Sequence, residues 1–171
     1  REGTVVDADD LVAEMISEAK REATERGKID EFSEEEKEKL FDMVGLGALK
    51  YFLLKVEPKK RMLFNPQESI DFQGNTGPFI QYTHARIKSI LRKATEQGIS
   101  VPTEISEITL HSSETDLIFQ LADYKTVIRK AADEYAPSIV ANYTYDLAKT
   151  FNSFYAELSV MNEPNEQLRG F

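Results

Sequence analysis

The chain has 171 residues, of which 41% are apolar, and a formal net charge of -9 at pH 7. This length and apolar content allow one large or two small globular domains. The sequence has no apolar run near the ~20 residues that span a bilayer. It also has no N-terminal leader with a charged start and an apolar stretch, so we expect a cytoplasmic protein that does not bind a membrane. The absence of cysteine and the separation of the only histidines, His84 and His111, lead us to expect no disulfide and no metal site.

Charge is distributed unevenly along the chain. Residues 1–48 carry 7 basic and 15 acidic side chains, residues 50–94 carry 9 and 3, and residues 95–171 carry 5 and 12. The net acidity argues against nucleic-acid binding, because phosphate contacts need clustered Lys and Arg. The basic middle third restores nucleic-acid binding as a hypothesis, although charges of both signs also commonly solvate helix faces.

The first third of the chain predicts two helices after a short strand at Thr4–Val6. Asp7 can cap the first helix and Gly27 can end it, and its apolar residues keep helical spacing: Leu11, Met15, Ile16 and Ala19. Ser33 and Glu36 have the spacing of a capping box, which predicts a second helix that stops before Pro58.

The next segment predicts an irregular region and then the basic amphipathic helix of the chain. Residues 61–64 favour an extended piece, with strand near Met62, and residues 65–75 favour an ordered loop without helix. The run from Gly74 to Gly77 favours a turn with positive φ, but it lacks the lysine of a phosphate-binding P-loop. Thr76 or Gly77 can cap the following helix, since Pro78 suits a first turn.

The last third predicts three further helices, and so six in all. Residues 98–112 form a polar connection that we expect to be disordered, and Ser113, Asp123 and Pro137 mark the helix starts. Short connections favour an antiparallel bundle. Residues 162–165 favour a turn, and residues 166–171 begin an element that stops within about one turn. We expect a chain cut at both ends, in which an apolar groove is left uncovered beside these residues of the last long helix: Leu147, Phe151 and Phe154.

Three segments resemble one protein family. The run Asn75-Thr-Gly-Pro-Phe-Ile-Gln-Tyr82, followed by His84-Ala-Arg-Ile87, is similar to the segment that introduces the anticodon-binding helical domain of class I arginyl-tRNA synthetases. The later helix of that domain resembles Tyr145-Asp-Leu-Ala-Lys149 with the aromatic residues that follow. Residues 1–11 resemble the family's sequence directly after the Lys-Met-Ser-Lys-Ser-type loop, and this resemblance makes Arg1 the last position of that loop.

This resemblance implies a mainly α fold, with at most short strands. Residues 1–75 would form a helical region that contacts the tRNA stem, and residues 76–171 would form an anticodon-binding helical bundle truncated at its C-terminus. The parent would be an ATP-dependent arginine-tRNA ligase, monomeric, with ATP and Mg as cofactors and tRNA(Arg) as its partner on the anticodon stem-loop side. The family activates arginine with two ATP motifs, a His-x-Gly-His-type motif and the Lys-Met-Ser-Lys-Ser-type loop. The first motif and all but the last position of the second are absent here, so we expect this fragment to hold no cofactor or catalytic residue and to be inactive alone.

Two hypotheses follow from these observations. In the first, positive side chains position the sugar-phosphate backbone, and amides and rings near residues 72–79 meet unpaired bases. The candidate tRNA-binding residues are Lys59, Lys60, Arg61, Gln73, Asn75, Phe79, Gln81, Tyr82, Arg86, Lys88, Arg92, Lys93 and Asn152. The alternative is a helical protein-interaction or scaffold module that does not bind nucleic acid and that docks partners in the uncovered groove.

Overall fold

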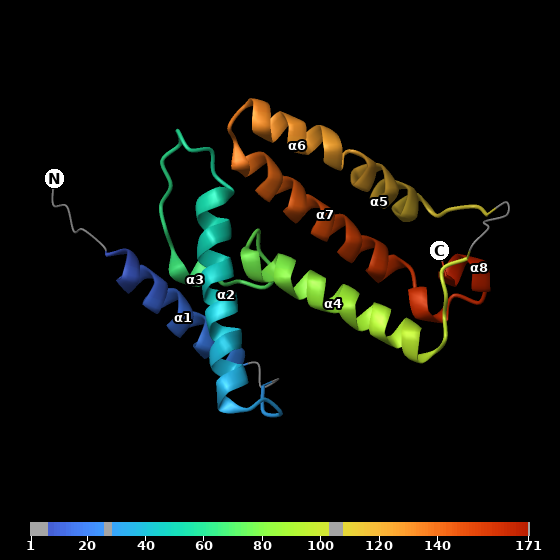
Figure 1. Cartoon of the computed structure of the whole chain (residues 1–171), viewed down its shortest axis with the longest axis horizontal. Coiled ribbons are helices and arrows are strands. Elements are labelled where there is room, and N and C mark those ends of the chain that lie inside the picture. The colour runs from blue at the N-terminus through green and yellow to red at the C-terminus, as the bar shows by residue number, and fades with distance from the viewer. Residues whose placement is uncertain (1–6, 26–28, 103–107, 171) are drawn as a thin grey trace.

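The computed structural model describes residues 7–25, 29–102 and 108–170, and all regular structure in these ranges is helical. Figure 1 shows α1 (Ala8–Glu25), α2 (Glu34–Leu54), α3 (Pro66–Ser69), α4 (Gly77–Glu96), α5 (Ser112–Ala122), α6 (Tyr124–Asp133), α7 (Pro137–Glu157), the short 3-10 helix η1 (Val160–Asn162) and α8 (Glu166–Gly170). The mainly α fold is thereby confirmed. The strand expected near Met62 is absent from the described residues, and the one expected at Thr4–Val6 lies outside them.

Most helix starts are set by local capping, as the sequence predicts. The Asp7 carboxylate accepts from the Asp9 N–H at 3.1 Å, and Ser33 and Glu36 form a reciprocal capping box at the start of α2. Thr76 caps α4, and Pro137 occupies the first turn of α7. The capping side chains satisfy N–H groups that have no partner within the helix, and Pro137 has no N–H to satisfy.

Three local predictions were wrong. The N-cap of α5 is His111 and not Ser113, because the His111 ring accepts from the Ser113 N–H while Glu114 completes a capping box. The loop 65–75 contains the single turn α3, capped by Asn65. Neither Gly74 nor Gly77 has a positive φ; among the described glycines only Gly98 does, at 69°.

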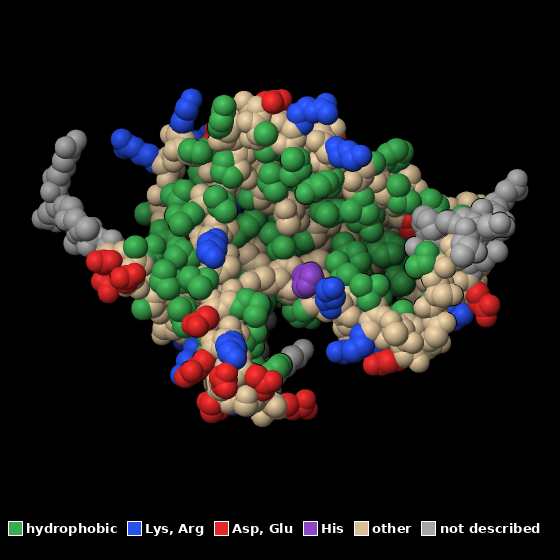
Figure 2. All heavy atoms as spheres, viewed as in Figure 1, with side chains coloured by type: hydrophobic (Ala, Val, Ile, Leu, Met, Phe, Trp, Pro, Cys, Tyr) green, Lys and Arg blue, Asp and Glu red, His purple; other side chains and the backbone are tan. Residues whose placement is uncertain are grey.

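One core cluster lies where α1 crosses α2. Met15 and Ala19 of α1 pack on Ala48 and Leu49 of α2, and Ile70, just after α3, closes the cluster at 1% exposure. The two helices approach closely because a Cβ at Gly45 would stand 2.9 Å from the backbone of α1. In Figure 2, acidic side chains gather around the end of the molecule where α2 begins.

The second half of the chain is organised around α7. On one side α4 lies beside α7 and runs in the same direction, and on the other side α5 and α6 run in the opposite direction (Figure 1). The antiparallel arrangement predicted for the last three helices is therefore found for α6 and α7 but is wrong for α5 and α6. Because Asp123 alone separates α5 from α6, the chain cannot reverse there, and these helices form one bent rod.

The last part of the chain leaves apolar side chains incompletely covered. Leu147, Phe151 and Phe154 on α7 are half-buried, as predicted.

No helix among the described residues combines the length and apolarity needed to cross a membrane.

Candidate nucleic-acid interface

A chain of hydrogen bonds joins α4 to α7 and ends on an arginine. The buried Thr83 hydroxyl donates to the Phe79 carbonyl of α4 at 2.9 Å. The Asn152 Nδ2 of α7 donates to Thr83 Oγ1 at 2.7 Å and to the Ala148 carbonyl at 2.8 Å. The other end of this amide, Oδ1, accepts from the Arg86 guanidinium. Arg86 is thus held by a side chain from a different helix.

Two tyrosine rings flank the same guanidinium. The Arg86 Cζ lies 5.0 Å from the centre of the Tyr82 ring and 5.3 Å from the centre of the Tyr155 ring, within cation–π range. Tyr82 is 47% exposed and Tyr155 is 37% exposed, so both rings also face solvent. Between them is a pocket of about 300 Å³, which is lined by Tyr82, Ala85, Arg86, Ser89, Ile90, Lys93, Tyr155 and Met161.

The loop before α4 forms a second, separate part of the candidate interface. Gln73 and Asn75 are exposed there. The backbone of the loop is braced from within, because the Asp71 carboxylate accepts from the Gln73 N–H at 2.8 Å and the Thr76 hydroxyl donates to the Asp71 carbonyl. Two side chains from the end of α2 also hold Asn75: the Tyr51 hydroxyl donates to Asn75 Oδ1 at 2.5 Å, and Lys55 Nζ donates to the Asn75 carbonyl at 2.8 Å.

Two predicted binding residues point into the protein. The half-buried Phe79 ring packs on Tyr145, with ring centres 5.3 Å apart. Gln81 donates from Nε2 to the Met43 carbonyl of α2 at 2.9 Å, and its amide lies against the backbone at Gly47. Both side chains therefore join α4 to its neighbours, and a tRNA contact by either one stays a prediction.

The predicted cations do not form one continuous surface. Lys59, Lys60 and Arg61 are exposed in the α2–α3 connection, where Lys60 pairs with Glu57 at 2.7 Å. On α4, only Lys93 joins Arg86 in the pocket, while Lys88 is exposed elsewhere and Arg92 lies 3.9 Å from Glu96. Arg1 lies outside the described residues. The structure thus divides the predicted cations among the α2–α3 connection, the pocket and other faces of α4.

Sequence reasoning missed several residues of these sites. Tyr155 and Met161 complete the pocket, and Tyr51 and Lys55 hold the loop. Tyr155 had a detectable signal, since it follows Asn152 on one helix at a spacing of three, whereas Met161 lies beyond the helix and had none. Among the described residues, no group of three or more His, Asp or Glu side chains could hold a metal ion.

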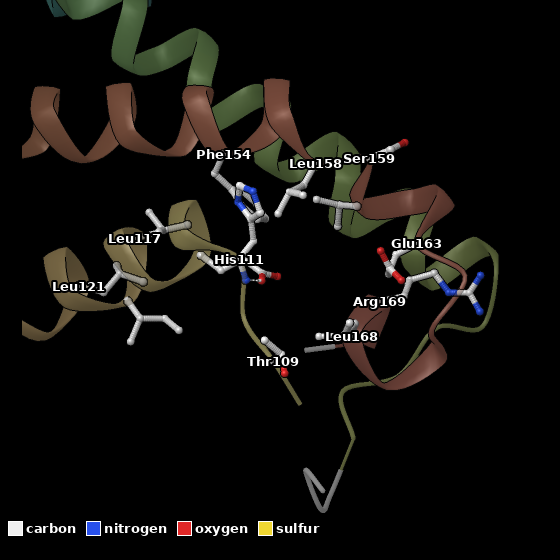
Figure 3. A pocket seen from close by; sticks show the side chains of 13 residues that line it. Thr109, His111, Leu117, Leu121, Phe154, Leu158, Ser159, Glu163, Leu168 and Arg169 are labelled. Carbon is white, nitrogen blue, oxygen red and sulfur yellow. Dashed lines mark hydrogen bonds between the residues drawn. The ribbon is translucent and has the colours of Figure 1, made fainter. Parts of the chain in front are cut away.

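A larger apolar groove lies apart from the predicted binding residues. It has a volume of about 520 Å³, and side chains from α5, the end of α7 and α8 point into it (Figure 3). Leu117 and Leu121 line one wall, and Phe154 and Leu158 line another. None of the candidate tRNA-binding residues contributes to this groove.

Comparison with known proteins relates the chain to one enzyme. Arginine-tRNA ligases of Bacteroides thetaiotaomicron and Parabacteroides distasonis are 56% and 55% identical to it over 172 residues. These alignments cover 100% of this chain and 29% of each relative, so the chain spans less than a third of their length.

Solved structures agree with the sequence comparison. Arginyl-tRNA synthetase of Thermus thermophilus superposes with a TM-score of 0.82 at 31% identity, over 99% of this chain and 29% of that one. The Plasmodium falciparum enzyme gives a TM-score of 0.76 at 26% identity, over 97% of this chain and 29% of that one. The profile of the family described as DALR anticodon binding domain matches residues 80–170, which include all but the first residues of α4, the whole of α7 and the pocket between them. The chain belongs to the DALR anticodon binding domain family.

Proposed function

We propose that this chain is the tRNA-binding part of an arginine-tRNA ligase and that it holds tRNA(Arg) on the anticodon stem-loop side. The observation that carries the proposal is the pocket between α4 and α7, where Arg86 lies between the rings of Tyr82 and Tyr155. Unpaired bases stack on exposed aromatic rings and guanidinium planes, and a nearby lysine can neutralise a phosphate. Lys93 lines the same pocket.

The proposal divides the work between two parts of the chain. Residues 76–171 contact unpaired bases through the pocket and the start of α4, and residues 1–75 contact the sugar-phosphate backbone of the stem through the cations of the α2–α3 connection. Phosphate contacts fix the orientation of the tRNA, whereas base contacts distinguish one tRNA from another. In support, the cations Lys59, Lys60 and Arg61 are exposed in the α2–α3 connection, while the aromatic rings lie at α4 and α7.

Ligation itself is assigned to the longer parent enzyme. The relatives are about three times as long as this chain, and their name describes the joining of arginine to tRNA. We propose a cytoplasmic, monomeric parent that binds ATP with Mg²⁺ in the part missing from this chain, with Arg1 as the last position of its Lys-Met-Ser-Lys-Ser-type loop. The 171-residue chain then binds tRNA without activating arginine.

Filter binding of tRNA(Arg) transcripts over a series of salt concentrations tests this function. The unmutated 171-residue chain, called the parent chain in these experiments, should bind with an affinity that falls steeply with salt. Replacement of Lys59, Lys60 and Arg61 by alanine should lower the log–log slope by roughly one unit for each lost phosphate contact. The matched control is a separate variant in which three other cations, Lys20, Lys37 and Lys39, are replaced by alanine. It should keep the salt slope of the parent chain, because these residues lie in α1 and near the start of α2. Equal slopes for the parent and both variants would place the tRNA elsewhere.

The apolar groove of Figure 3 favours a second candidate function, a protein-interaction module. Docking in such a groove depends on the burial of apolar surface and responds little to salt, unlike phosphate binding. Salt-independent association with another protein, together with no measurable tRNA binding, would select this alternative.

A further inference from the structure

Asn75, in the loop between α3 and α4, accepts two hydrogen bonds from side chains at the end of α2. Tyr51 and Lys55 lie one turn apart on the same face of α2, and their side chains reach the Asn75 side-chain oxygen and backbone carbonyl. The Lys55 ammonium also lies 5.9 Å from the Tyr51 ring centre and 5.4 Å from that of Phe52. These contacts order the end of the Lys55 side chain at the position from which it bonds Asn75.

In the structure the Asn75 amide turns its oxygen toward Tyr51, whose hydroxyl donates to Oδ1 at 2.5 Å. Burial raises the pKa of the Tyr51 phenol, so the hydroxyl keeps the proton that this bond uses. The amide oxygen is therefore engaged, and Nδ2 remains as the outward-facing group. Asn75 is exposed, and Nδ2 makes no hydrogen bond to any other residue in the described ranges.

We propose that Tyr51 and Lys55 are positioning residues that hold the Asn75 amide so that its Nδ2 donates a hydrogen bond to an acceptor atom on an unpaired base. This inference rests on the proposed tRNA binding and names the chemistry that the loop selects: a carbonyl oxygen or a ring nitrogen without a proton. The braced loop presents this donor in one orientation. A donor held in one orientation discriminates among bases because it cannot turn to suit a base without an acceptor at that position, and it binds more tightly because less conformational entropy is lost.

Tyr51→Phe tests the inference, since it removes the hydroxyl and keeps the ring. Binding is measured with the 171-residue chain, a tRNA(Arg) transcript and transcripts with single base changes in the anticodon loop. The variant should bind the unchanged transcript about three- to tenfold more weakly, as for the loss of one hydrogen bond. It should also lose part of the discrimination at one nucleotide, while the salt dependence stays that of the parent.

A double-mutant cycle separates positioning from a general structural effect. In an Asn75→Ala background the amide is gone, so Tyr51→Phe should weaken binding no further. Lys55→Arg should bind close to the parent because it keeps a donor, whereas Lys55→Met should behave like Tyr51→Phe. Tyr143→Phe is the matched control, because its hydroxyl donates to the Gln120 carbonyl at 2.8 Å in a different part of the molecule. It should leave binding and discrimination unchanged.

The outcomes distinguish this inference from the function on which it rests. If the parent chain binds no transcript, the proposed function fails and the inference fails with it. If the parent binds but Tyr51→Phe keeps full affinity and discrimination, or adds its full effect to Asn75→Ala, only the inference is overturned. A change in salt slope without a change in base discrimination would assign Asn75 to a phosphate and would also overturn it.

Discussion

Asn152 uses both ends of its amide within the protein. Its Nδ2 bonds Thr83 and the Ala148 carbonyl, and its Oδ1 bonds Arg86. The residue is half-buried between α4 and α7, so little of its hydrogen-bonding capacity is left for a ligand. We therefore expect Asn152 to act on tRNA through the guanidinium that it orients.

Asn152→Ala should lower the free energy of unfolding by ~1–3 kcal/mol, because it leaves partly buried groups without partners. Urea denaturation at neutral pH measures this loss. Asn162→Ala is the control, since its single bond to Ser159 is exposed, and it should stay within ~0.5 kcal/mol of the parent. Equal stability of the parent and Asn152→Ala would mean that the bonds between α4 and α7 contribute nothing to the fold.

At this scale the sequence predicts residue types better than side-chain directions. It selected Tyr82, Arg86 and Lys93, which meet in one pocket, but it also selected Gln81, which bonds α2. Gln81 and Tyr82 are neighbours and both polar. Their different positions depend on which faces of α4 are covered by α2 and α7, and that is decided by contacts between segments distant in the sequence.

The helices begin where the sequence predicts because capping is local. A capping box needs two side chains three positions apart, and Ser33 with Glu36 shows this directly in the sequence. His111 was missed because histidine is not among the preferred N-cap residues, although Glu114 stands at the capping-box position three residues later. The turn α3 was missed because four residues are too few to show helical periodicity.

The capping box of α2 predicts a pH dependence of stability. The pKa of Glu36 lies below its ordinary value, chiefly because its carboxylate accepts from the Ser33 N–H and also from the Ser33 hydroxyl. A group with a lowered pKa in the folded state stabilises the fold above its unfolded pKa, and that stability is lost as pH falls through the folded pKa. Part of the acid destabilisation below the ordinary value of 4.5 should therefore belong to Glu36.

Glu36→Gln should remove that part of the acid dependence and leave the neutral-pH stability only slightly reduced. Urea midpoints measured from about pH 3 to about pH 7 check this expectation. Glu38→Gln makes the same charge change on the same helix outside the capping box, and it should keep the acid profile of the parent. Coincident profiles for the two variants would show that the box carries no proton-linked stability.

On the scale of the whole molecule, glycines decide how α4 meets α2. A Cβ on Gly77 would stand 2.5 Å from the Gly47 carbonyl oxygen, so the first turn of α4 rests on the backbone of α2. Gly45 and Gly47 in the apolar stripe of α2 predict close neighbours, but the pattern does not identify Gly77 as one of them. Gly77 looked like part of a turn, whereas its role is to leave room for another helix.

Gly77→Ala should lower the free energy of unfolding by ~1–3 kcal/mol, because a methyl group there must push two backbones apart. Thermal unfolding followed by circular dichroism measures the effect. Gly74→Ala, in the loop before α4, is the control, since its Cβ would meet only side-chain atoms, with Asp71 Oδ2 the nearest at 3.2 Å. A Gly77→Ala variant as stable as Gly74→Ala would mean that α4 is free to shift on α2.

Helix directions could not be predicted from the sequence. Short connections correctly place α6 and α7 side by side, because a short loop returns the chain along its neighbour. The pairing of α4 with α7 spans the connection from α4 to α5, the rod of α5 and α6 and the link to α7, so no short loop sets its direction. The pocket forms at that interface, which explains why its residues could be predicted one by one and not as a site.

The parallel pairing of α4 with α7 also bears on the order in which the molecule assembles. Thr83 and Asn152, whose bond joins these helices, are 69 residues apart along the chain, whereas Tyr143 reaches Gln120 across only 23. Closing the longer loop costs more chain entropy and must wait for the intervening segments to condense. The rod formed by α5 and α6 can therefore settle on α7 early, and the Arg86 pocket, which needs both ends of the long loop, is among the last features to form as the chain folds.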